Sequence, residues 1–269
     1  MKSYRRCLSI AGSDPSGGAG LQADLKTFSA LGCYGMTAVV AVVDENTVGV
    51  TGVHPLPVDF VTGQIRSCLD DIGADAIKIG MLHSAELILA VRDTLRAYPI
   101  RDIVLDPVMV ATSGDPLLRE DAITTLRDEL IPSARLITPN IPEAEILIGR
   151  KLSAGDDLRE AARQLSQGGR VSVFLKAGHL DSETLSDILY DAETDTIHLM
   201  ESPKIATVNT HGTGCTLSSA IASYLALGNS LPEACRLAKD YISAAILAGA
   251  EYTVGHGHGP VHHFHSFWD

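Results

Sequence analysis

The order in which apolar runs and amphipathic segments follow one another constrains the fold of this chain most. Short apolar runs, such as RCLSIAG at 6–12 and AIKIGM at 76–81, have the length and composition of buried strands. Segments of helix length with an apolar face, such as 21–32 and 84–98, lie between such runs. This order predicts an α/β fold of three layers, in which a mostly parallel central sheet is covered by helices on both faces. Ligands of such sheets bind at the carboxyl ends of the strands.

The remaining elements continue this pattern with one exception. We expect further strands at 36–43, 102–110, 136–138 and 171–178, and further helices at 58–73, 142–149, 156–168, 214–227 and 231–249. The exception is LSDILYDAETDTIHLMES at 185–202, where two β-rich runs around a turn signal predict an antiparallel hairpin near the sheet edge. No repeat or linker marks a boundary, so we expect residues 1–269 to form a single domain.

Composition and charge exclude several classes of protein. A chain of 269 residues that is 45% hydrophobic can bury a full core. Its formal net charge of −12, with no run of basic residues, would repel nucleic acids and anionic membranes. No apolar segment approaches the ~18 residues of a membrane span, and the apolar run at the N-terminus is too short for a signal peptide. We therefore predict a soluble, cytoplasmic protein with no nucleic-acid or membrane partner.

The cysteines do not form a disulfide or zinc framework. The chain has five cysteines, which are far apart, have no CxxC pair and are odd in number. We expect reduced thiols, most of them small core residues.

A glycine-rich loop, GSDPSGGAG at 12–20, follows the first predicted strand. Its last glycines fit a dinucleotide-binding fingerprint, but five residues separate them from the glycine that follows the strand, where that fingerprint requires a tight turn. A Walker A loop is excluded because Gly18 and Ala19 stand in the Lys and Ser/Thr places. We interpret the segment as a loop that closes over a small ligand, with an ordinary glycine-rich turn as the alternative.

A second glycine-rich segment, NTHGTGCTLSSAI at 209–221, surrounds a cysteine where a helix is predicted to begin. Gly212, Thr213 and Gly214 would let backbone N–H groups and the helix dipole point at an anion, so that phosphate is bound locally despite the acidic chain. In that field we expect the thiol of Cys215 to be biased toward the thiolate, which suits a base or a nucleophile. The alternative is a buried structural cysteine.

Polar residues also follow three predicted strands. Asp106 ends the run IVL, Asn140 and Glu143 follow LIT, and Lys176 ends VFL. Oxygen ligands at adjacent strand ends suit Mg²⁺ on ATP, and Lys176 is placed to meet phosphates as a point charge. Alternatively, Asn140 and Glu143 form a helix capping box, Asp106 only terminates a strand, and Lys176 lies at the surface.

Several motifs in order resemble one enzyme family over essentially the whole chain. AGSDPSGGAGLQADLKTFSALGCYGMTAV, KIGML, DPVMVATSGDPLL, LITPNIPEAE, HGTGCTLSSAIA and the terminal GPVHHFHSF are similar to the hydroxymethylpyrimidine and phosphomethylpyrimidine kinases of thiamine biosynthesis. These kinases belong to the ribokinase-like superfamily. The resemblance therefore implies a ribokinase-like fold, and transfer of the ATP γ-phosphoryl group to 4-amino-5-hydroxymethyl-2-methylpyrimidine and then to its monophosphate.

The resemblance also implies roles for individual residues. Cys215 would be the general base, where many superfamily members use Asp, and the N–H groups of Gly212, Thr213 and Gly214 would stabilise the transferred phosphoryl group. ATP and Mg²⁺ are the implied cofactors, with Lys176, Asn140 and Thr210 at ATP and with Asp106 and Glu143 at Mg²⁺, partly through water. The implied lining of the pyrimidine pocket is Gly12, Asp24, Val43, Glu45, Met81 and Val108. Met81 as core filler and Asp24 as a solvated helix residue are the alternatives. A homodimer is implied, and assistance by K⁺ is left open.

Position 45 departs from the family pattern. The family usually has Gln in QNT, whereas this chain has Glu45 in DENT. An ionised carboxylate only accepts hydrogen bonds, so an unprotonated ring nitrogen facing it would lose its donor, at a cost of about 1–3 kcal/mol. Either Glu45 shares a proton with the ring, or the substrate has another donor pattern, as a pyridinium has. Asp44 would raise the pKa of Glu45 if both faced inward, but strand alternation sends them to opposite faces.

Three other functions therefore stay open at this point. They are a pyridoxal or pyridoxine kinase, a non-catalytic pyrimidine-binding protein and, more remotely, a nicotinamide-dependent oxidoreductase. The tail GHGHGPVHHFHSFWD has no regular ligand spacing, so we predict a structured tail near the nucleotide side and no transition-metal site.

Overall fold

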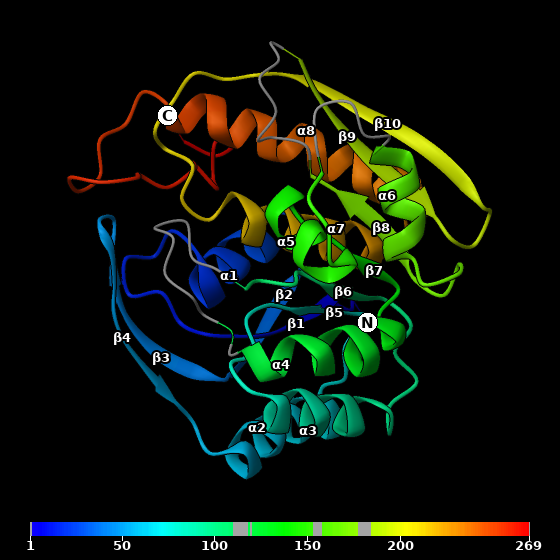
Figure 1. The fold of residues 1–269 in the computed structure, drawn as a ribbon. Coiled ribbons are helices and arrows are strands. Elements are labelled where there is room, and N and C mark those ends of the chain that lie inside the picture. The colour runs from blue at the N-terminus through cyan, green and yellow to red at the C-terminus, as the bar shows by residue number, and fades with distance from the viewer. Residues whose placement is uncertain (1, 110–117, 119, 153–157, 177–183, 269) are drawn as a thin grey trace.

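A central sheet of eight strands organises the computed structural model, which describes residues 2–109, 118, 120–152, 158–176 and 184–268 (Figure 1). The strand order is β10-β9-β8-β7-β6-β5-β1-β2, and neighbouring strands from β2 to β8 pair in parallel. The bounds of these parallel strands are β1 Arg6–Ala11, β2 Tyr34–Val39, β5 Ala76–Ile79, β6 Ile103–Leu105, β7 Leu136–Ile137 and β8 Ser172–Leu175. The predicted α/β fold with a mostly parallel sheet is confirmed.

Helices cover both faces of this sheet. Alternate strand residues point to opposite faces, so Leu8 and Leu105 belong to one buried core while Cys7 and Val104 belong to the other. One face is covered by α2 Val58–Asp71, α3 Ala85–Leu95, α4 Glu120–Thr125, α5 Ile141–Ile148 and α6 Leu158–Leu165. The other face is covered by α1 Gly20–Ala30, α7 Thr213–Ala226 and α8 Leu231–Gly249. The predicted three layers are therefore present (Figure 1).

The antiparallel hairpin predicted at 185–202 is confirmed. Strands β9 Thr184–Asp191 and β10 Thr196–Pro203 pair antiparallel and form one edge of the central sheet. A hairpin suits this place because antiparallel strands need only a short turn between them.

The strand expected at 36–43 is divided into two. β2 ends at Val39, and the chain leaves the central sheet to form β3 Ala41–Asn46, which pairs with β4 Gly49–Pro55 in a separate hairpin. The break was not predicted because residues 36–43 are mostly apolar on both sides of it. β4 was not predicted because the segment GVTGVHP contains two glycines and a histidine, which are not typical of a strand. This second hairpin projects from the body of the protein (Figure 1).

The sequence analysis also named no element between 111 and 135. Here α4 continues into a π-helical turn at Leu126–Leu130 and a 3₁₀ turn at Ile131–Ser133. Parts of other expectations lie outside the described residues: the end of the strand at 102–110, most of DPVMVATSGDPLL, the start of the helix at 156–168 and the end of the strand at 171–178.

Candidate active site

A cavity of about 710 Å³ opens at the carboxyl ends of the parallel strands. Gly12 follows β1, Met81 follows β5, Asp106 follows β6 and Lys176 follows β8, so adjacent strand ends deliver side chains to one place. The cavity is lined by all of the predicted site residues except one: Gly12, Val43, Glu45, Met81, Asp106, Val108, Asn140, Glu143, Lys176, Thr210, Gly212, Thr213, Gly214 and Cys215. Met81 therefore lines the cavity as well as packing in the core.

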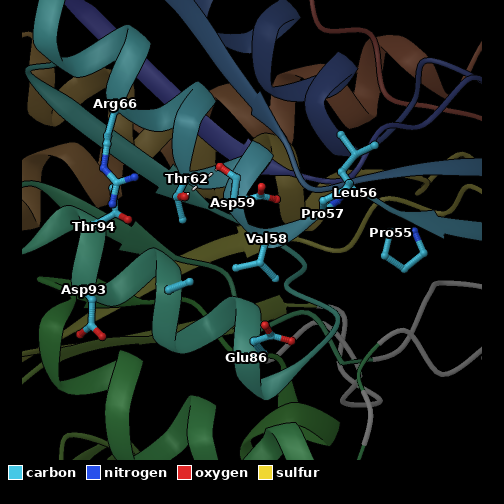
Figure 2. A pocket seen from close by; sticks show the side chains of 11 residues that line it. Pro55, Leu56, Pro57, Val58, Asp59, Thr62, Arg66, Glu86, Asp93 and Thr94 are labelled. Atoms are coloured by element: carbon cyan, nitrogen blue, oxygen red, sulfur yellow. Dashed lines mark hydrogen bonds between the residues drawn. The ribbon is translucent and has the colours of Figure 1, made fainter.

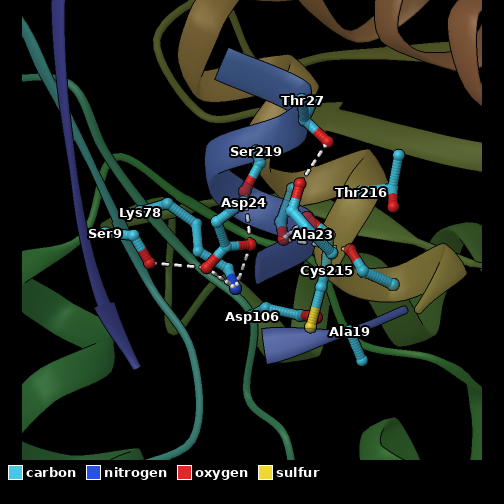
Figure 3. A network of polar contacts seen from close by, with 12 residues as sticks. Ser9, Ala19, Ala23, Asp24, Thr27, Lys78, Asp106, Cys215, Thr216 and Ser219 are labelled. Carbon is cyan, nitrogen blue, oxygen red and sulfur yellow. Dashed lines mark hydrogen bonds and ion pairs between the residues drawn. The ribbon is translucent and has the colours of Figure 1, made fainter. Parts of the chain in front are cut away.

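The exception is Asp24, which was expected to line the substrate pocket or to be solvated. Its side chain is fully buried and lies behind the cavity, where it accepts hydrogen bonds from Ser9, from Ser219 Oγ at 2.7 Å and from Lys78 Nζ at 2.8 Å (Figure 3). Both expectations were wrong, because the face of α1 that carries Asp24 packs against the sheet and α7. Asp24 holds Lys78, which does line the cavity.

Lys78 was missed by the sequence analysis. It lies within β5, a strand whose four residues are all buried. Burial alone would lower the pKa of its ammonium, but the charge of Asp24 opposes this and keeps the pKa above the usual value. A lysine inside the otherwise apolar run AIKI was the available signal, since a fully buried lysine requires a partner.

Replacing Lys78 with methionine should lower the free energy of unfolding by about 3–5 kcal/mol, because Asp24 would stay buried without its cation. The double variant Asp24→Leu/Lys78→Met, which removes both charges, should lose much less stability. Urea unfolding followed by circular dichroism measures both. A loss below about 1 kcal/mol in the single variant would contradict the assigned ion pair.

The glycine-rich loop at 12–20 is organised by Asp14. This buried carboxylate accepts hydrogen bonds from the backbone N–H groups of Ser16, Gly18 and Ala19, and it lies 2.9 Å from Nε2 of His211. Burial alone would raise the pKa of Asp14, but the hydrogen bonds of His211, Ser16 and Ala19 hold it well below its usual range. The same contact raises the pKa of His211 against the effect of burial. Five residues of the loop, Gly12, Ser13, Asp14, Ala19 and Gly20, line the cavity, so the loop is part of the site.

The segment before α7 lies directly against this loop. Gly212 has a φ of +78°, and a Cβ atom there would lie 1.8 Å from the carbonyl oxygen of Gly18. The N–H groups of the first turn of α7 have no carbonyl partner within the helix, and Thr213 N–H makes only a long bond of 3.3 Å to the carbonyl of Thr210. A glycine is thus required at 212 to bring this helix N-terminus to the cavity.

An acid and a cation face the first turn of α7. Nζ of Lys176 donates to Oδ1 of Asp106 at 3.1 Å, and Thr138 Oγ1 donates to the same oxygen at 2.9 Å. A Cβ atom on Gly214 would lie 3.3 Å from both Oδ2 of Asp106 and Nζ of Lys176. Lys176 is therefore a largely but not fully buried cation at the helix N-terminus, with 16% of its side chain exposed, and the alternative of a surface lysine is wrong.

Asn140 and Glu143 form the capping box that the sequence analysis gave as an alternative. Asn140 Oδ1 accepts from Glu143 N–H at 2.9 Å, and Glu143 Oε2 accepts from Asn140 N–H at 2.8 Å. Both residues also line the cavity, so capping does not exclude a ligand-binding role. Burial raises the pKa of Glu143 to about 7, Lys176 opposes this rise and Asp106 adds to it.

The expectation of a thiolate at Cys215 is wrong for the ligand-free protein. Burial raises the pKa of the thiol to about 11, the charge of Lys78 opposes the rise, and the charges of Asp24 and Asp106 add to it. Figure 3 shows the sulfur beside Asp106, between the first turns of α1 and α7. The sequence analysis considered only the helix field and not the desolvation of the thiol.

Glu45 lines the cavity from β3, with Oε1 4.0 Å from Nε2 of His211. Asp44 is exposed, as the alternation along the strand predicted.

The edge of the cavity formed by β9, β10 and α8 was not predicted. Asp187 and Lys239 form a buried ion pair at 2.5 Å there, beside an apolar wall that consists of Leu185, Ile205, Ile242 and Ile246. The spacing of Ile242 and Ile246 indicates only one face of a helix, and sequence does not distinguish a cavity wall from core at such a face.

A second hollow, of about 750 Å³, lies between α2 and α3 (Figure 2). Its charged side chains include Asp59, Arg66, Glu86 and Asp93, and it contains none of the predicted site residues.

The C-terminal tail is structured, but its described part contributes no residue to the cavity lining. It contacts the tip of the β3–β4 hairpin and the segment before α7, and His263 Nε2 lies 3.0 Å from Thr216 Oγ1.

Within the described ranges, no group of three or more His, Cys, Asp or Glu side chains is arranged to hold a metal ion. No helix in the described parts of the chain is long and apolar enough to cross a membrane.

Comparisons of sequence agree on one family, and comparisons of structure also give pyridoxal kinases. The sequence family described as phosphomethylpyrimidine kinase matches residues 14–262. A hydroxymethylpyrimidine/phosphomethylpyrimidine kinase of Rhizobium meliloti is 48% identical over 264 residues, which cover 97% of each chain. Among solved structures, Bacillus subtilis pyridoxal kinase with ADP is 39% identical, with a TM-score of 0.90 over 99% of this chain and 100% of that one. A phosphomethylpyrimidine kinase from Clostridium difficile is 45% identical, with a TM-score of 0.79 over 90% of this chain and 99% of that one.

Proposed function

This chain belongs to the phosphomethylpyrimidine kinase family, and we propose that it phosphorylates 4-amino-5-hydroxymethyl-2-methylpyrimidine and then its monophosphate, with ATP, in thiamine biosynthesis. Its fold is ribokinase-like. The observation that carries the proposal is one cavity in which a helix N-terminus, the largely buried Lys176 and carboxylates lie between two differently lined ends.

The two ends of the cavity suit the two substrates. Gly12, Val43, Glu45, Met81 and Val108 come from β3 and from the ends of β1, β5 and β6, and offer a mostly apolar slot for a small heterocycle. The apolar wall and the Asp187–Lys239 pair come from the opposite edge of the sheet, beyond β8, and offer room for a nucleotide. The first turn of α7 and Lys176 lie between them.

Phosphoryl transfer needs positioning and charge stabilisation more than covalent chemistry. The N–H groups of Gly212, Thr213 and Gly214 would donate to the oxygens of the transferred group, and Thr213 N–H would exchange its long bond to Thr210 for one to a phosphate. Lys176 would add a full positive charge beside them. Asn140 and Thr210 would contact the nucleotide from either side of this turn.

Cys215 would take the proton of the substrate hydroxyl as the general base. Its thiol is protonated in the ligand-free protein at neutral pH, so only a small fraction of molecules has the base in its active form at any moment. This role predicts a rate that rises with pH.

The carboxylates of Asp106 and Glu143 fit a magnesium ion. They follow β6 and β7 at adjacent strand ends, and Mg²⁺ is usually held by one or two carboxylates together with phosphates and water. When bound, Mg²⁺ neutralises charge on the phosphates. Burial raises the pKa of Glu143 to about 7 in the metal-free protein, and a bound Mg²⁺ would lower it by favouring the carboxylate.

A pyridoxal or pyridoxine kinase is the second candidate. Glu45 favours it, because a carboxylate in the heterocycle pocket suits a protonated pyridine nitrogen. Solved pyridoxal kinases are also similar to this chain over nearly its full length.

We further propose that residues 1–269 act as one cytoplasmic kinase domain that assembles as a homodimer. Sedimentation velocity measures the assembly.

The proposed activity is tested by ³¹P NMR of the products formed from Mg-ATP and each substrate. Phosphate bonded to the hydroxymethyl oxygen, followed by a diphosphate signal from the second step, is the expected result. Hydrolysis of ATP to free phosphate without a phosphorylated heterocycle would contradict the proposal.

A further inference from the structure

The β3–β4 hairpin carries the heterocycle end of the cavity but is not part of the central sheet. Val43 and Glu45 point to the cavity, whereas Val42, Val48 and Val53 on the hairpin are exposed. An isolated two-stranded hairpin is at best marginally stable in water. Its position over the cavity therefore depends on contacts made elsewhere.

The C-terminal tail holds that tip. Thr47 Oγ1 accepts hydrogen bonds from the backbone N–H groups of His256 and Gly257, both at 3.2 Å, and the Thr47 carbonyl accepts from His258 N–H at 2.9 Å. The fit is close, because a Cβ atom on Gly255 would lie 2.2 Å from Thr47 Oγ1, and one on Gly257 would lie 1.9 Å from the Thr47 carbonyl oxygen. We name residues 255–260 the C-terminal strap.

The other end of the strap reaches the loops that would bind phosphate. His211 N–H donates to the carbonyl of Gly259 at 3.0 Å, and His211 and Pro260 form an isolated β-bridge. A Cβ atom on Gly18 would lie 3.1 Å from the side chain of Pro260. The strap thus connects the tip of the hairpin, two residues beyond Glu45, to the residue that precedes Gly212.

We propose that the C-terminal strap fixes the distance between the heterocycle end and the phosphoryl-transfer end of the cavity, and that Thr47 is the positioning residue through which it acts. This inference rests on the proposed kinase reaction. Thr47 itself does not line the cavity, so it would act by holding the hairpin and not by touching the substrate.

The test compares Thr47→Val with Thr47→Ser and with Thr51→Val. Valine keeps the shape of threonine but removes the two hydrogen bonds to the strap, and serine retains the hydroxyl. Thr51→Val is the matched control, because the Thr51 hydroxyl in the same hairpin donates only to the carbonyl of Asp44 within that hairpin. Steady-state ADP release gives KM for each substrate, and hydrogen–deuterium exchange gives the protection of amides 44–50.

In Thr47→Val we expect KM for the heterocycle to rise roughly tenfold while KM for ATP stays within twofold of native. Exchange at amides 44–50 should become faster, and the serine and Thr51 variants should behave as native in both measurements. Three results would each contradict the proposed role of the strap: equal changes in both KM values, native exchange in Thr47→Val, or non-native behaviour of Thr47→Ser. If the native protein phosphorylates no pyrimidine, the proposed function fails, but the role of Thr47 can still be tested. The exchange of amides 44–50 and the KM for pyridoxine are then compared among the same variants.

Discussion

Replacing Gly212 with alanine is expected to lower kcat/KM by about 10²–10³, the loss that follows removal of a backbone donor from an anion hole. The new methyl group would lie 1.8 Å from the Gly18 carbonyl oxygen, so the glycine-rich loop and the segment before α7 would have to separate. That movement displaces the N–H groups of the first turn of α7 from the phosphoryl group. ADP release with saturating and limiting heterocycle gives kcat and kcat/KM.

Gly228 provides the matched control for this variant. It also has a positive φ, +92°, but a Cβ atom there would meet nothing within 4 Å, and the residue does not line the cavity. Gly228→Ala therefore carries a similar backbone cost without the collision, and we expect near-native kcat/KM. Activity of Gly212→Ala within threefold of Gly228→Ala would contradict the role given to the contact between the two loops.

Replacing Cys215 with alanine is expected to lower kcat by about 10²–10⁴, the usual contribution of a general base. The native enzyme should also show a rate that rises with pH. The pKa of the thiol lies at about 11, above its ordinary value of 9.0, so the thiolate fraction increases about tenfold for each unit between pH 7 and 9. Log kcat/KM, which reports the ligand-free enzyme, should therefore have a slope near one in this range when chemistry limits the rate.

Two further variants separate the base from the structural role of Cys215. Cys215→Asp supplies the base that many ribokinase-like enzymes use, and it should recover part of the activity and lose the slope. Cys235 is buried, whereas Cys215 is partly exposed in the cavity, and Cys235 does not line the cavity, so Cys235→Ala should keep native kcat. Native kcat in purified Cys215→Ala, or the same pH slope in that variant, would exclude the thiol as the base.

Much of the fold was predictable because apolar strands and amphipathic helices have different periods. The β9–β10 hairpin was recognisable from its turn signal, and the placement of α7 and α8 from their length and periodicity. The division between β2 and β3 was not recognisable, since the residues on both sides of Val40 are equally apolar and only tertiary contacts decide where the chain leaves the sheet.

The site was predictable where polar residues directly follow strands or open a helix, as Asp106, Lys176 and Gly212 do. Asp24 and Lys78 could not be paired from sequence, because they are 54 positions apart and meet only after α1 packs on the sheet. The pKa of Cys215 was misjudged for a related reason. The helix dipole can be inferred from local sequence, whereas desolvation depends on everything that surrounds the thiol.

The central claim, that this cavity phosphorylates the thiamine-pathway pyrimidine, is tested most directly by coupled ADP release with Mg-ATP. The aminohydroxymethylpyrimidine, its monophosphate and pyridoxine are compared for the native protein and for Glu45→Gln. The account predicts that the native protein turns over both pyrimidines, with a higher kcat/KM than for pyridoxine. In Glu45→Gln, which lacks the carboxylate, the kcat/KM for pyridoxine relative to that for the pyrimidines should fall further. A native protein that is idle on both pyrimidines but active on pyridoxine would contradict it.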